Sequence, residues 1–281
     1  MTPHSQPNIC FIGAGNMASS LIGGLVANQF PAQNLIAYDI NTERLQYIQH
    51  HFAIQTDTDQ QHAMARADIV ILAVKPQVMQ QLCKGLATGI AGLVTKPLIM
   101  SIAAGVRAGD INRWLGGNLA IVRCMPNTPA LVKLGASALY ANERVTSTQQ
   151  QQAEQILQST GVTVWVDVES QLDAVTAISG SGPAYFFLFI EALQNAAIEL
   201  GLNSETGALL ARQTALGAST MALDQDVVKL RQQVTSKGGT TEQAIASFTA
   251  NNFTRIVLDA TRAAHKRSQQ LADQLAEDST Q

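Results

Sequence analysis

The sequence has few charged residues, few aromatic residues and few cysteines. Charged side chains make up 14% of the 281 residues and aromatic side chains 5%, whereas 46% of the residues are hydrophobic. With 18 basic and 21 acidic residues the formal net charge is −3, and no basic stripe is visible along the chain. A nucleic-acid-binding surface needs clustered positive charge, so we expect no nucleic-acid partner. The composition instead indicates a well-buried globular protein, with room for one large domain or two of ordinary size.

Long apolar runs and paired cysteines are missing as well. The most apolar run, Ala184–Ile190, is followed by Glu191 and is too short to span a membrane. The start, MTPHSQP, lacks the charged and apolar regions of a secretory signal. The cysteines are odd in number and far apart, with no CxxC pair and no metal-type spacing; they are Cys10, Cys83 and Cys124. We therefore expect no membrane association, no metal and a cytoplasmic location.

A glycine-rich turn stands out near the start, in Asn8–Gly24, which reads NICFIGAGNMASSLIGG. Five strand-forming residues lead into Gly13-Ala-Gly15-Asn-Met-Ala18, and a helical pattern follows. The first glycine permits a tight turn, the second lets a bound group approach the backbone, and Ala18 lets the helix pack closely on the strand. Free N–H groups at the helix start offer a site for a pyrophosphate. A GxGxxA motif between a strand and a helix predicts a dinucleotide-binding domain.

Asp39 supplies the acid that such a domain uses. It ends the second expected strand, about twenty residues after the glycine motif, where an acid typically binds the ribose of the cofactor. The alternative is that Asp39 caps the helix that starts near Asn41–Thr42, and the sequence leaves it open.

Strands and helices alternate from Ile9 to about Val166. The expected strands are Asn8–Ile12, Asn34–Tyr38, Ala53–Gln55, Asp68–Ala73, Leu98–Ser101, Ala120–Cys124, Ala136–Ala141 and Thr163–Val166. Helical stretches between them include Thr42–His50, Gln77–Ala87 and Thr148–Ser159. The runs at 69–74 and 98–102 are apolar throughout, as in strands covered on both faces. This alternation predicts an α/β fold with a doubly wound parallel sheet of the Rossmann type.

The loops after three of these strands are candidate ligand contacts, because ligands of such sheets lie outside the carboxyl ends of the strands. The loop AVKPQ at 73–77 leaves Lys75 free to face a nucleotide. The loop SIAAG at 101–105, which includes Ala103, has small residues that let a flat ring approach. In CMPNTP at 124–129, two prolines hold Asn127, whose side chain can pair with a carboxamide. Each loop can also be read as an ordinary turn.

After Asp167 no further strand is expected, which divides the chain into a dinucleotide-binding domain at 1–167 and a helical domain at 168–281. The expected helices are Gln171–Ile178, Pro183–Leu200, Ser204–Leu223, Asp226–Val234, Thr241–Ala250 and Phe253–Gln274. The residues Phe186–Ile190 are apolar on all sides of their helix. A helix of this kind is usually buried from several directions, so we expect an obligate dimer.

Two glycine-rich breaks interrupt the helical domain, at Ile178–Pro183 and Val234–Thr241. Thr240 and Gln243 fit a capping box at the start of the following helix. Consecutive N–H groups from Gly238, Gly239 and Thr240, together with the helix dipole, would form a compact anion site. The alternative is a pair of sharp helical corners.

Five segments together resemble the pyrroline-5-carboxylate reductase family, whose members catalyse the last step of proline biosynthesis. They are FIGAGNMA at 11–18, AVKPQ at 73–77, MPNTPA at 125–130, AISGSGPAY at 177–185 and VTSKGGTTEQA at 234–244. They follow the family's order along nearly the whole chain. One departure is Lys237, where the family usually has proline. The lysine makes a more mobile loop or attracts a carboxylate, and the sequence does not rank the two effects.

The resemblance implies that NADPH or NADH gives a hydride to 1-pyrroline-5-carboxylate, producing L-proline. It also implies roles for the matching residues. Pyrophosphate would be held by Gly13, Gly15, Asn16 and Met17, and the nucleotide would be lined by Ala73, Val74, Lys75 and Pro76, with Asn127 at the nicotinamide end. The substrate carboxylate would be bound by Ser236, Gly238, Gly239 and Thr240, and Thr241 would act in catalysis by hydrogen-bonding the ring nitrogen. Relatives suggest decamers built from dimers.

Two other functions remain as alternatives. A β-hydroxyacid dehydrogenase has a similar sheet followed by helices, but those enzymes resemble one another in a catalytic lysine on the long helix after the sheet. The stretch Pro183–Leu200 contains neither lysine nor arginine. A non-catalytic protein that senses NAD(P)H would leave the two glycine-rich loops without a purpose. Asp39 favours NADH whereas the family often uses NADPH, so we expect both cofactors to work.

Overall fold

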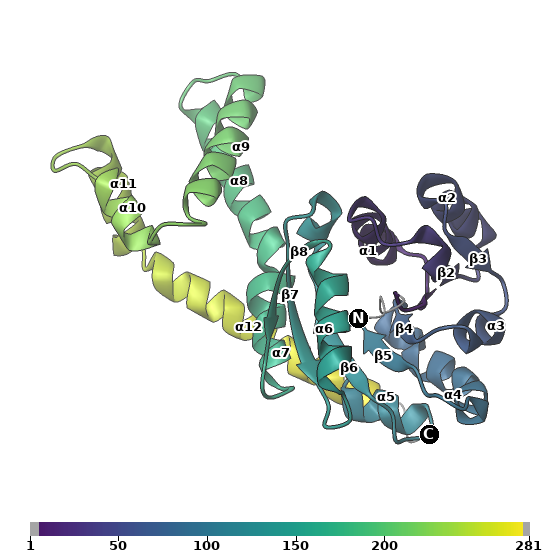
Figure 1. Cartoon of the computed structure of the whole chain (residues 1–281). Coiled ribbons are helices and arrows are strands. Elements are labelled where there is room, and N and C mark those ends of the chain that lie inside the picture. Colours follow the sequence, from purple (N-terminus) through teal and green to yellow (C-terminus); the bar gives the residue numbers. More distant parts are fainter. Residues whose placement is uncertain (1–5, 278–281) are drawn as a thin grey trace. The chain divides into compact units, whose positions relative to one another are not determined.

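The protein's structure is a computed structural model that describes residues 6–277. Most of the segment MTPHSQP and the last four residues lie outside the described residues. Contacts divide the chain into two compact units, whose elements Figure 1 shows. The sheet unit comprises the residues up to Ser181 together with those from Ala264 onwards, and the helical unit comprises Gly182–Ala263.

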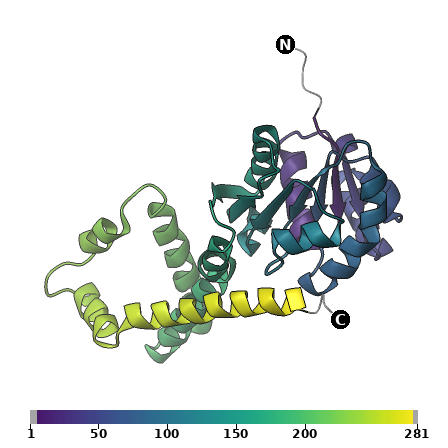
Figure 2. The same ribbon diagram turned by 90° about the horizontal axis from the view of Figure 1, so that it is seen from below.

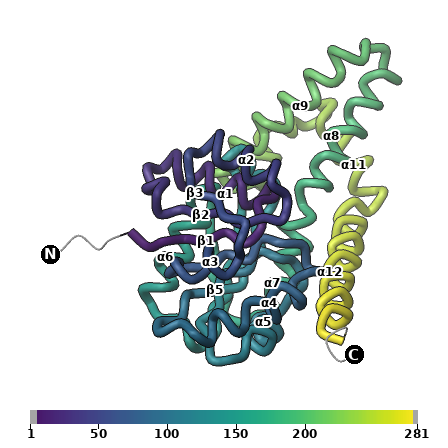
Figure 3. Tube along the Cα trace, turned by 90° about the vertical axis from the view of Figure 1, so that its right-hand side faces the viewer, coloured from purple at the N-terminus to yellow at the C-terminus, as the bar shows by residue number. Residues whose placement is uncertain are grey.

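The sheet unit contains an 8-stranded sheet with the order β3-β2-β1-β4-β5-β6-β7-β8. The strands are β1 (Ile9–Ile12), β2 (Leu35–Tyr38), β3 (Gln55–Asp57), β4 (Ile69–Leu72), β5 (Leu98–Ser101), β6 (Ile121–Met125), β7 (Gly135–Ala141) and β8 (Gly161–Trp165). From β3 to β6 neighbouring strands run parallel, in the order of a Rossmann domain. Figure 3 shows β3, β2 and β1 following one another. The α/β fold is confirmed, although β3 begins where the expected strand ended.

The sheet is parallel, as predicted, except at one edge. β7 pairs antiparallel with β6, and β8 pairs parallel with β7. The connection between β6 and β7 is only residues 126–134, with a 3₁₀ turn at Thr128–Val132. A parallel crossover needs about a dozen residues or more, usually including a helix, so this connection can only reverse the chain. Helix α6 (Ser147–Gln158) then provides the crossover that makes β8 parallel to β7.

Helices cover both faces of the sheet (Figure 2). One face packs against α1 (Asn16–Ala27), α2 (Thr42–Phe52) and α6, and the other against α3 (Gln60–Ala65), α4 (Pro76–Gly92) and α5 (Ala108–Trp114). Alternate residues of β1 serve the two faces: Phe11 lies in the first core and Ile12 in the second. The apolar runs of β1, β4 and β5 are therefore buried throughout, as predicted.

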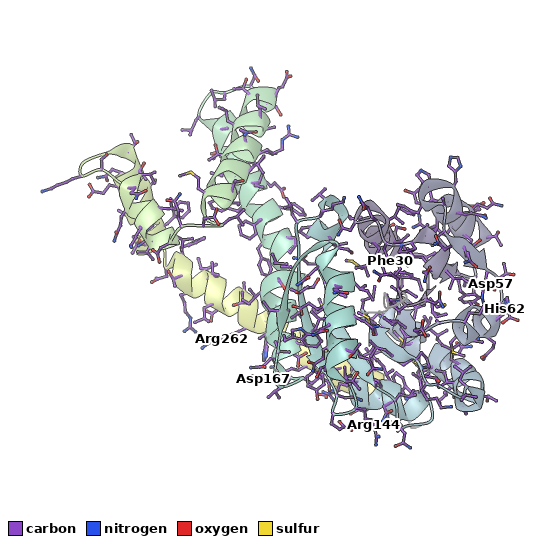
Figure 4. The ribbon with its side chains drawn as sticks, viewed as in Figure 1. Phe30, Asp57, His62, Arg144, Asp167 and Arg262 are labelled. Atoms are coloured by element: carbon purple, nitrogen blue, oxygen red, sulfur yellow. The ribbon has the colours of Figure 1, made fainter. Side chains whose placement is uncertain are left out.

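Two short helices, α3 and α5, add to the helical stretches that the sequence analysis names. Asp59 is the N-cap of α3, and its carboxylate accepts hydrogen bonds from the N–H groups of Gln61 and His62. The His62 ring also bonds Asp57, with 2.5 Å between Nδ1 and Oδ2 (Figure 4). The pKa of Asp57 is lowered, first by the hydrogen bond from the Asp59 N–H and then by His62. The side chains of Asp57, Asp59 and His62 thus form hydrogen bonds within the segment that leads into α3, and they do not indicate a binding site.

The segment Ile178–Pro183, which was expected to be a glycine-rich break, does not separate two helices. Helix α7 (Gln171–Val175) continues into a π-helical turn, Thr176–Gly180, and α8 begins at Gly182. The Ser181 N–H donates to the Thr176 carbonyl, five residues back, at 2.8 Å. The segment that was expected to interrupt two helices therefore widens a nearly continuous one. Turns of this kind are rare and occur frequently at functional sites.

The helical unit contains α8 (Gly182–Glu199), α9 (Ser204–Met221), α10 (Val227–Gln233), α11 (Thr240–Ala250) and the first part of α12 (Phe253–Glu277). Many of its large apolar side chains are exposed in the single chain, and Phe186, Phe187 and Leu188 are each more than 60% exposed. No helix among the described residues has the length and apolar character that crossing a membrane requires.

The last part of α12 belongs to the sheet unit, and polar contacts hold it there. Arg107 pairs with Asp273 at 2.5 Å, and the Ser268 hydroxyl donates to the buried Asp173 carboxylate at 2.6 Å. Ala272 is buried between these two contacts along the helix. The sheet unit is therefore assembled from two separate stretches of the chain.

Candidate cofactor and substrate site

The glycine loop after β1 can hold only glycine at position 13. Gly13 has φ 108°, and a Cβ atom there would lie 2.6 Å from the carbonyl oxygen of Ala73 and 3.1 Å from the side chain of Val74. Its N–H donates to the Tyr38 carbonyl at 2.8 Å. The loops after β1, β2 and β4 thus meet at this residue, which brings the predicted contacts Ala73 and Val74 next to the glycine loop.

The N-terminus of α1 fits a pyrophosphate. Its N-cap is Gly15, no side chain caps it, and its first turn contains no acid. The N–H groups of Asn16, Met17 and Ala18 at such a terminus lack intrahelical acceptors and carry the positive end of the helix dipole. A Cβ atom on Gly15 would meet nothing within 4 Å, so the space in front of the helix is open. This is the cradle that a bound pyrophosphate requires.

Asp39 and Arg44 bind the backbone N–H and the backbone carbonyl of Ala14, respectively. One Asp39 carboxylate oxygen accepts from the Ala14 N–H at 2.7 Å, and the other accepts from the Asn41 N–H at 2.8 Å. The Arg44 guanidinium donates to the Ala14 carbonyl from Nε at 3.0 Å and from Nη2 at 2.8 Å, and Nη2 also reaches the hydroxyl of Ser19. The acid that was expected to bind ribose therefore also fixes the glycine loop.

The alternative role of Asp39 as the cap of α2 does not hold. Asn41 is the N-cap of that helix, and its side chain accepts from the N–H groups of Glu43 and Arg44. Asp39 lies two residues before Asn41 and accepts a hydrogen bond from its backbone N–H. Both carboxylate oxygens of Asp39 retain a second lone pair, so the carboxylate can still accept from a sugar hydroxyl.

The loops after β4 and β5 lie next along the same edge of the sheet, because these strands follow β1 in the strand order. Lys75 is exposed and is the N-cap residue of α4, and Pro76 is its first residue, where the missing N–H costs nothing. Ala103 follows β5 and is buried. A cation and a small residue thus stand at the carboxyl ends of neighbouring strands, as the sequence predicts for a nucleotide contact.

Asn127 follows β6 and is almost wholly buried, with 9% of its surface exposed. Its Nδ2 donates to the Ser179 carbonyl at 3.0 Å, and its Oδ1 accepts from the Ala136 N–H at 2.9 Å. The side chain thus already makes two hydrogen bonds within the protein. One Nδ2 hydrogen and one Oδ1 lone pair remain for the expected carboxamide contact.

The capping box expected in the second glycine-rich loop is absent. The N-cap of α11 is Gly239 rather than Thr240, and no side chain caps the helix. Thr240 is already helical, so the expected pairing with Gln243 is one residue out of register. The uncapped terminus leaves the N–H groups of its first turn free for an anion, as in α1.

The loop before α11 has its own internal bonds. Gly238 has φ 72°, and its N–H donates to the Glu242 carboxylate at 2.7 Å. Gly239 donates to the Ser236 carbonyl at 3.0 Å, and a Cβ atom on Gly239 would lie 2.6 Å from the Ser236 hydroxyl. A carboxylate of the chain itself thus sits where the sequence expects a substrate carboxylate. Glu242 was not among the expected site residues, although its position three residues after Gly239 is a typical one for an acid at a helix start.

The expected site residues form two sets, one in each unit. Residues for the cofactor lie at the strand ends of the sheet unit, and Ser236–Thr241 lie in the helical unit. Sequence reasoning missed the contacts that Arg44, Ser179 and Glu242 make. The signal for Ser179 was present, because Pro183 stands four residues later and has no N–H to offer its carbonyl.

Comparisons with known proteins cover both units. Residues 169–271 match the family model described as pyrroline-5-carboxylate reductase dimerisation, and residues 8–105 match one described as NADP oxidoreductase, coenzyme F420-dependent. The matched dimerisation model indicates that the chain self-associates.

Relatives match over nearly the whole length. The pyrroline-5-carboxylate reductase of Pseudomonas aeruginosa is 50% identical over 275 residues, which is 97% of this chain and 100% of the relative. A solved pyrroline-5-carboxylate reductase from Coxiella burnetii has a TM-score of 0.90 and 43% identity over 95% of this chain and 98% of its own. The Plasmodium falciparum pyrroline carboxylate reductase, solved with NADP bound, has a TM-score of 0.82 and 30% identity over 95% and 98%. The chain therefore belongs to the pyrroline-5-carboxylate reductase family of NAD(P)H-dependent oxidoreductases.

Proposed function

We propose that this protein transfers a hydride from NADPH or NADH to C5 of the cyclic imine 1-pyrroline-5-carboxylate, producing L-proline in the last step of proline biosynthesis. The observation that carries the proposal is the 50% identity to one such reductase along 97% of the chain. When bound, the reduced nicotinamide supplies the hydride. A protonated imine is already an electrophile, so the main task of the protein is to bring the two rings together.

Each cofactor residue has a task in this proposal. The N–H groups at Asn16 and Met17 bind the pyrophosphate, and Gly13 and Gly15 keep the backbone close to it. Asp39 reads the ribose. Further contacts to the nucleotide come from the strand-end residues Ala73, Val74, Lys75, Pro76 and Ala103, and Asn127 lies at the nicotinamide end. The open space at Gly15 and the uncapped α1 support this assignment.

The substrate loop takes the carboxylate of the imine. The N–H groups of Gly238 and Thr240, with the Ser236 hydroxyl, bind its oxygens. Gly239 lies between them and holds the shape of the loop, because its own N–H donates to the Ser236 carbonyl. Thr241 hydrogen-bonds the ring nitrogen. The bond between the Glu242 carboxylate and the Gly238 N–H at 2.7 Å supports the proposal, because a carboxylate of the chain itself already binds this N–H. The substrate carboxylate replaces Glu242 on binding, which leaves that side chain as a nearby acid.

The functional division follows the sequence analysis, with a dinucleotide-binding domain at 1–167 and a dimerisation and substrate domain at 168–281. The exposed apolar face of α8 supports a homodimer built by the helical unit, and a decamer of five dimers is the larger assembly we propose. A cytoplasmic location is supported by three buried cysteines, all of which are free thiols.

The experiment is to follow the loss of reduced-nicotinamide absorbance when the imine is added to purified protein and NADPH. Turnover that yields proline supports the proposal. Binding of NADPH without turnover would instead support a cofactor sensor. The matched control is 1-pyrroline, which has the ring but no carboxylate: it should react with a much higher KM, because it cannot use the anion site before α11. Oxidation of a β-hydroxy acid with NADP⁺ would favour the dehydrogenase alternative.

A further inference from the structure

The carbonyl of Ser179 lacks the hydrogen-bond donor that a regular helix would supply. In a regular helix this carbonyl would accept from the residue four positions later, but that residue is Pro183, which has no N–H. A proline ring also clashes with the carbonyl four residues before it, so a regular α-helix is excluded at this point. The chain instead opens into the π-helical turn Thr176–Gly180, and the Ser179 carbonyl turns to a side chain of another element.

That side chain is Asn127. Its amide donates to the Ser179 carbonyl at 3.0 Å and accepts from the N–H of Ala136 at 2.9 Å. One buried group thus joins the end of β6, the start of β7 and the π-helical turn. An unpaired carbonyl in this part-buried position would be costly, so the Asn127 amide determines where the turn lies.

The turn also lies close to the end of β6. A Cβ atom on Gly180 would lie 2.4 Å from the Cε of Met125, the last residue of β6. Glycine at 180 thus lets the turn approach the strand end closely, and the Asn127 hydrogen bond holds the turn there. Both contacts lie at the carboxyl end of a parallel strand, where nucleotide ligands of this fold bind.

We propose that Asn127 is a positioning residue: it holds the π-helical turn Thr176–Gly180 against the end of β6 and thereby sets the geometry of the nicotinamide end for hydride transfer. The inference rests on the proposed function. Asn127 acts on the reaction through the Ser179 carbonyl, in addition to any contact of its own with the cofactor. Loss of its donor should therefore impair hydride transfer far more than the binding of the adenine end.

Asn127→Asp is the sharpest change, because it keeps the acceptor for Ala136 and places an oxygen against the Ser179 carbonyl. The matched control is Asn142→Asp at the opposite end of the same two strands. Asn142 donates to the Leu119 carbonyl at 2.9 Å and accepts from the Ile121 N–H at 3.1 Å, so the same chemical change removes an equivalent bridge. Both full-length variants are compared with the wild type for thermal stability, kcat and affinity for adenosine 2′,5′-bisphosphate.

The expected result for Asn127→Asp is a loss of about 10²-fold in kcat, since displacements of about 1 Å have effects of this size. Its affinity for adenosine 2′,5′-bisphosphate should stay within about twofold of the wild type. This probe contains only the adenosine and phosphate part of the cofactor, which binds at the end of the site away from the nicotinamide. The deuterium isotope effect with NADPH labelled at the transferred hydrogen should rise, as hydride transfer becomes rate-limiting. Asn142→Asp should lose a similar amount of stability and leave kcat and the isotope effect unchanged.

Equal losses of kcat in the two variants, or an unchanged isotope effect, would overturn the inference. Should Asn127→Asp fail to fold, Asn127→Ser provides a second route, because the shorter hydroxyl side chain removes the amide donor to the Ser179 carbonyl without adding a charge. Asn127→Ser should lower kcat and raise the isotope effect in the same way; a folded Asn127→Ser variant with the kcat of the wild type would also overturn the inference. A wild-type protein that does not reduce the imine would refute the proposed function instead, so the two failures are distinguishable.

Discussion

The double role proposed for Asp39 makes the choice of cofactor a quantitative test. If Asp39 binds the ribose as proposed, its negative charge lies where NADPH carries the 2′-phosphate and NADH a hydroxyl. It also accepts from the N–H groups of Ala14 and Asn41. Replacement by serine would remove both bonds along with the charge, because the shorter side chain cannot span them. Asp39→Asn is the better perturbation, since it removes the charge and keeps one acceptor.

The magnitude follows from the charge and its exposure. Two unit charges about 4 Å apart interact with about 1 kcal/mol in water and about 4 kcal/mol at an effective dielectric constant of about 20. Asp39 is partly exposed, so water screens it and we expect about 1–2 kcal/mol. This corresponds to about a tenfold change in the ratio of kcat/KM for NADPH to that for NADH, toward NADPH. Loosening of the glycine loop affects both cofactors alike, because both carry a pyrophosphate, and it cancels in the ratio.

Steady-state rates with each cofactor at saturating imine provide the ratio. Glu43→Gln is the matched control: it removes a carboxylate from the first turn of α2, where Glu43 is exposed, without touching Ala14. It should change the ratio by less than about twofold, as expected for a screened surface charge. A ratio that stays constant in Asp39→Asn, or that moves equally in both variants, would refute the assignment of Asp39 to the ribose.

Three further predictions concern the loops and the core. Gly13→Ala should lower the melting temperature of the unliganded protein, because the methyl group meets a carbonyl oxygen at 2.6 Å, whereas Gly15→Val should leave it unchanged and weaken NADPH binding; equal melting temperatures would contradict the loop geometry. Thr241→Ala should lose on the order of 10²-fold in kcat if its hydroxyl assists proton delivery, and a loss below about threefold would assign it a structural role only. Burial raises the pKa of the Cys10 and Cys83 thiols to about 12, so at about pH 8 a thiol reagent should label them only after unfolding. Above about pH 9 the unfolded thiols ionise while the native ones keep their protons, so the free energy of unfolding should fall as pH rises, and a flat profile would contradict the burial.

Local patterns were sufficient for the parts of the fold in which each residue's environment follows from its neighbours in sequence. The strand Ile69–Leu72 is apolar at every position, which only a strand covered on both faces tolerates. Gly13 and Gly15 were assigned from backbone requirements that any phosphate-binding turn has. Their φ values and surroundings differ in the way the motif demands, with Gly13 enclosed and Gly15 open.

What the sequence could not provide depends on contacts between distant segments. The reversal at β7 follows from the length of a connection whose 3₁₀ turn has no clear local signal. The capping box was placed one residue late, because Gly239 satisfies the N-cap position without a side chain. Pro183 excludes a regular helix, but only the folded chain reveals that Asn127, 52 residues before Ser179, supplies the missing donor.

The shared helix α12 has a consequence for the order in which the protein is made. Its last part, from Ala264, completes the sheet unit through Asp273 and Ser268, yet it emerges from the ribosome after the whole helical unit. The nucleotide-binding half therefore cannot finish folding as soon as its own strands are synthesised, as an N-terminal domain usually does. Until Ser268 has been synthesised, Asp173 lacks this hydrogen-bond donor, and the early half of the chain depends on the late one for its final stability.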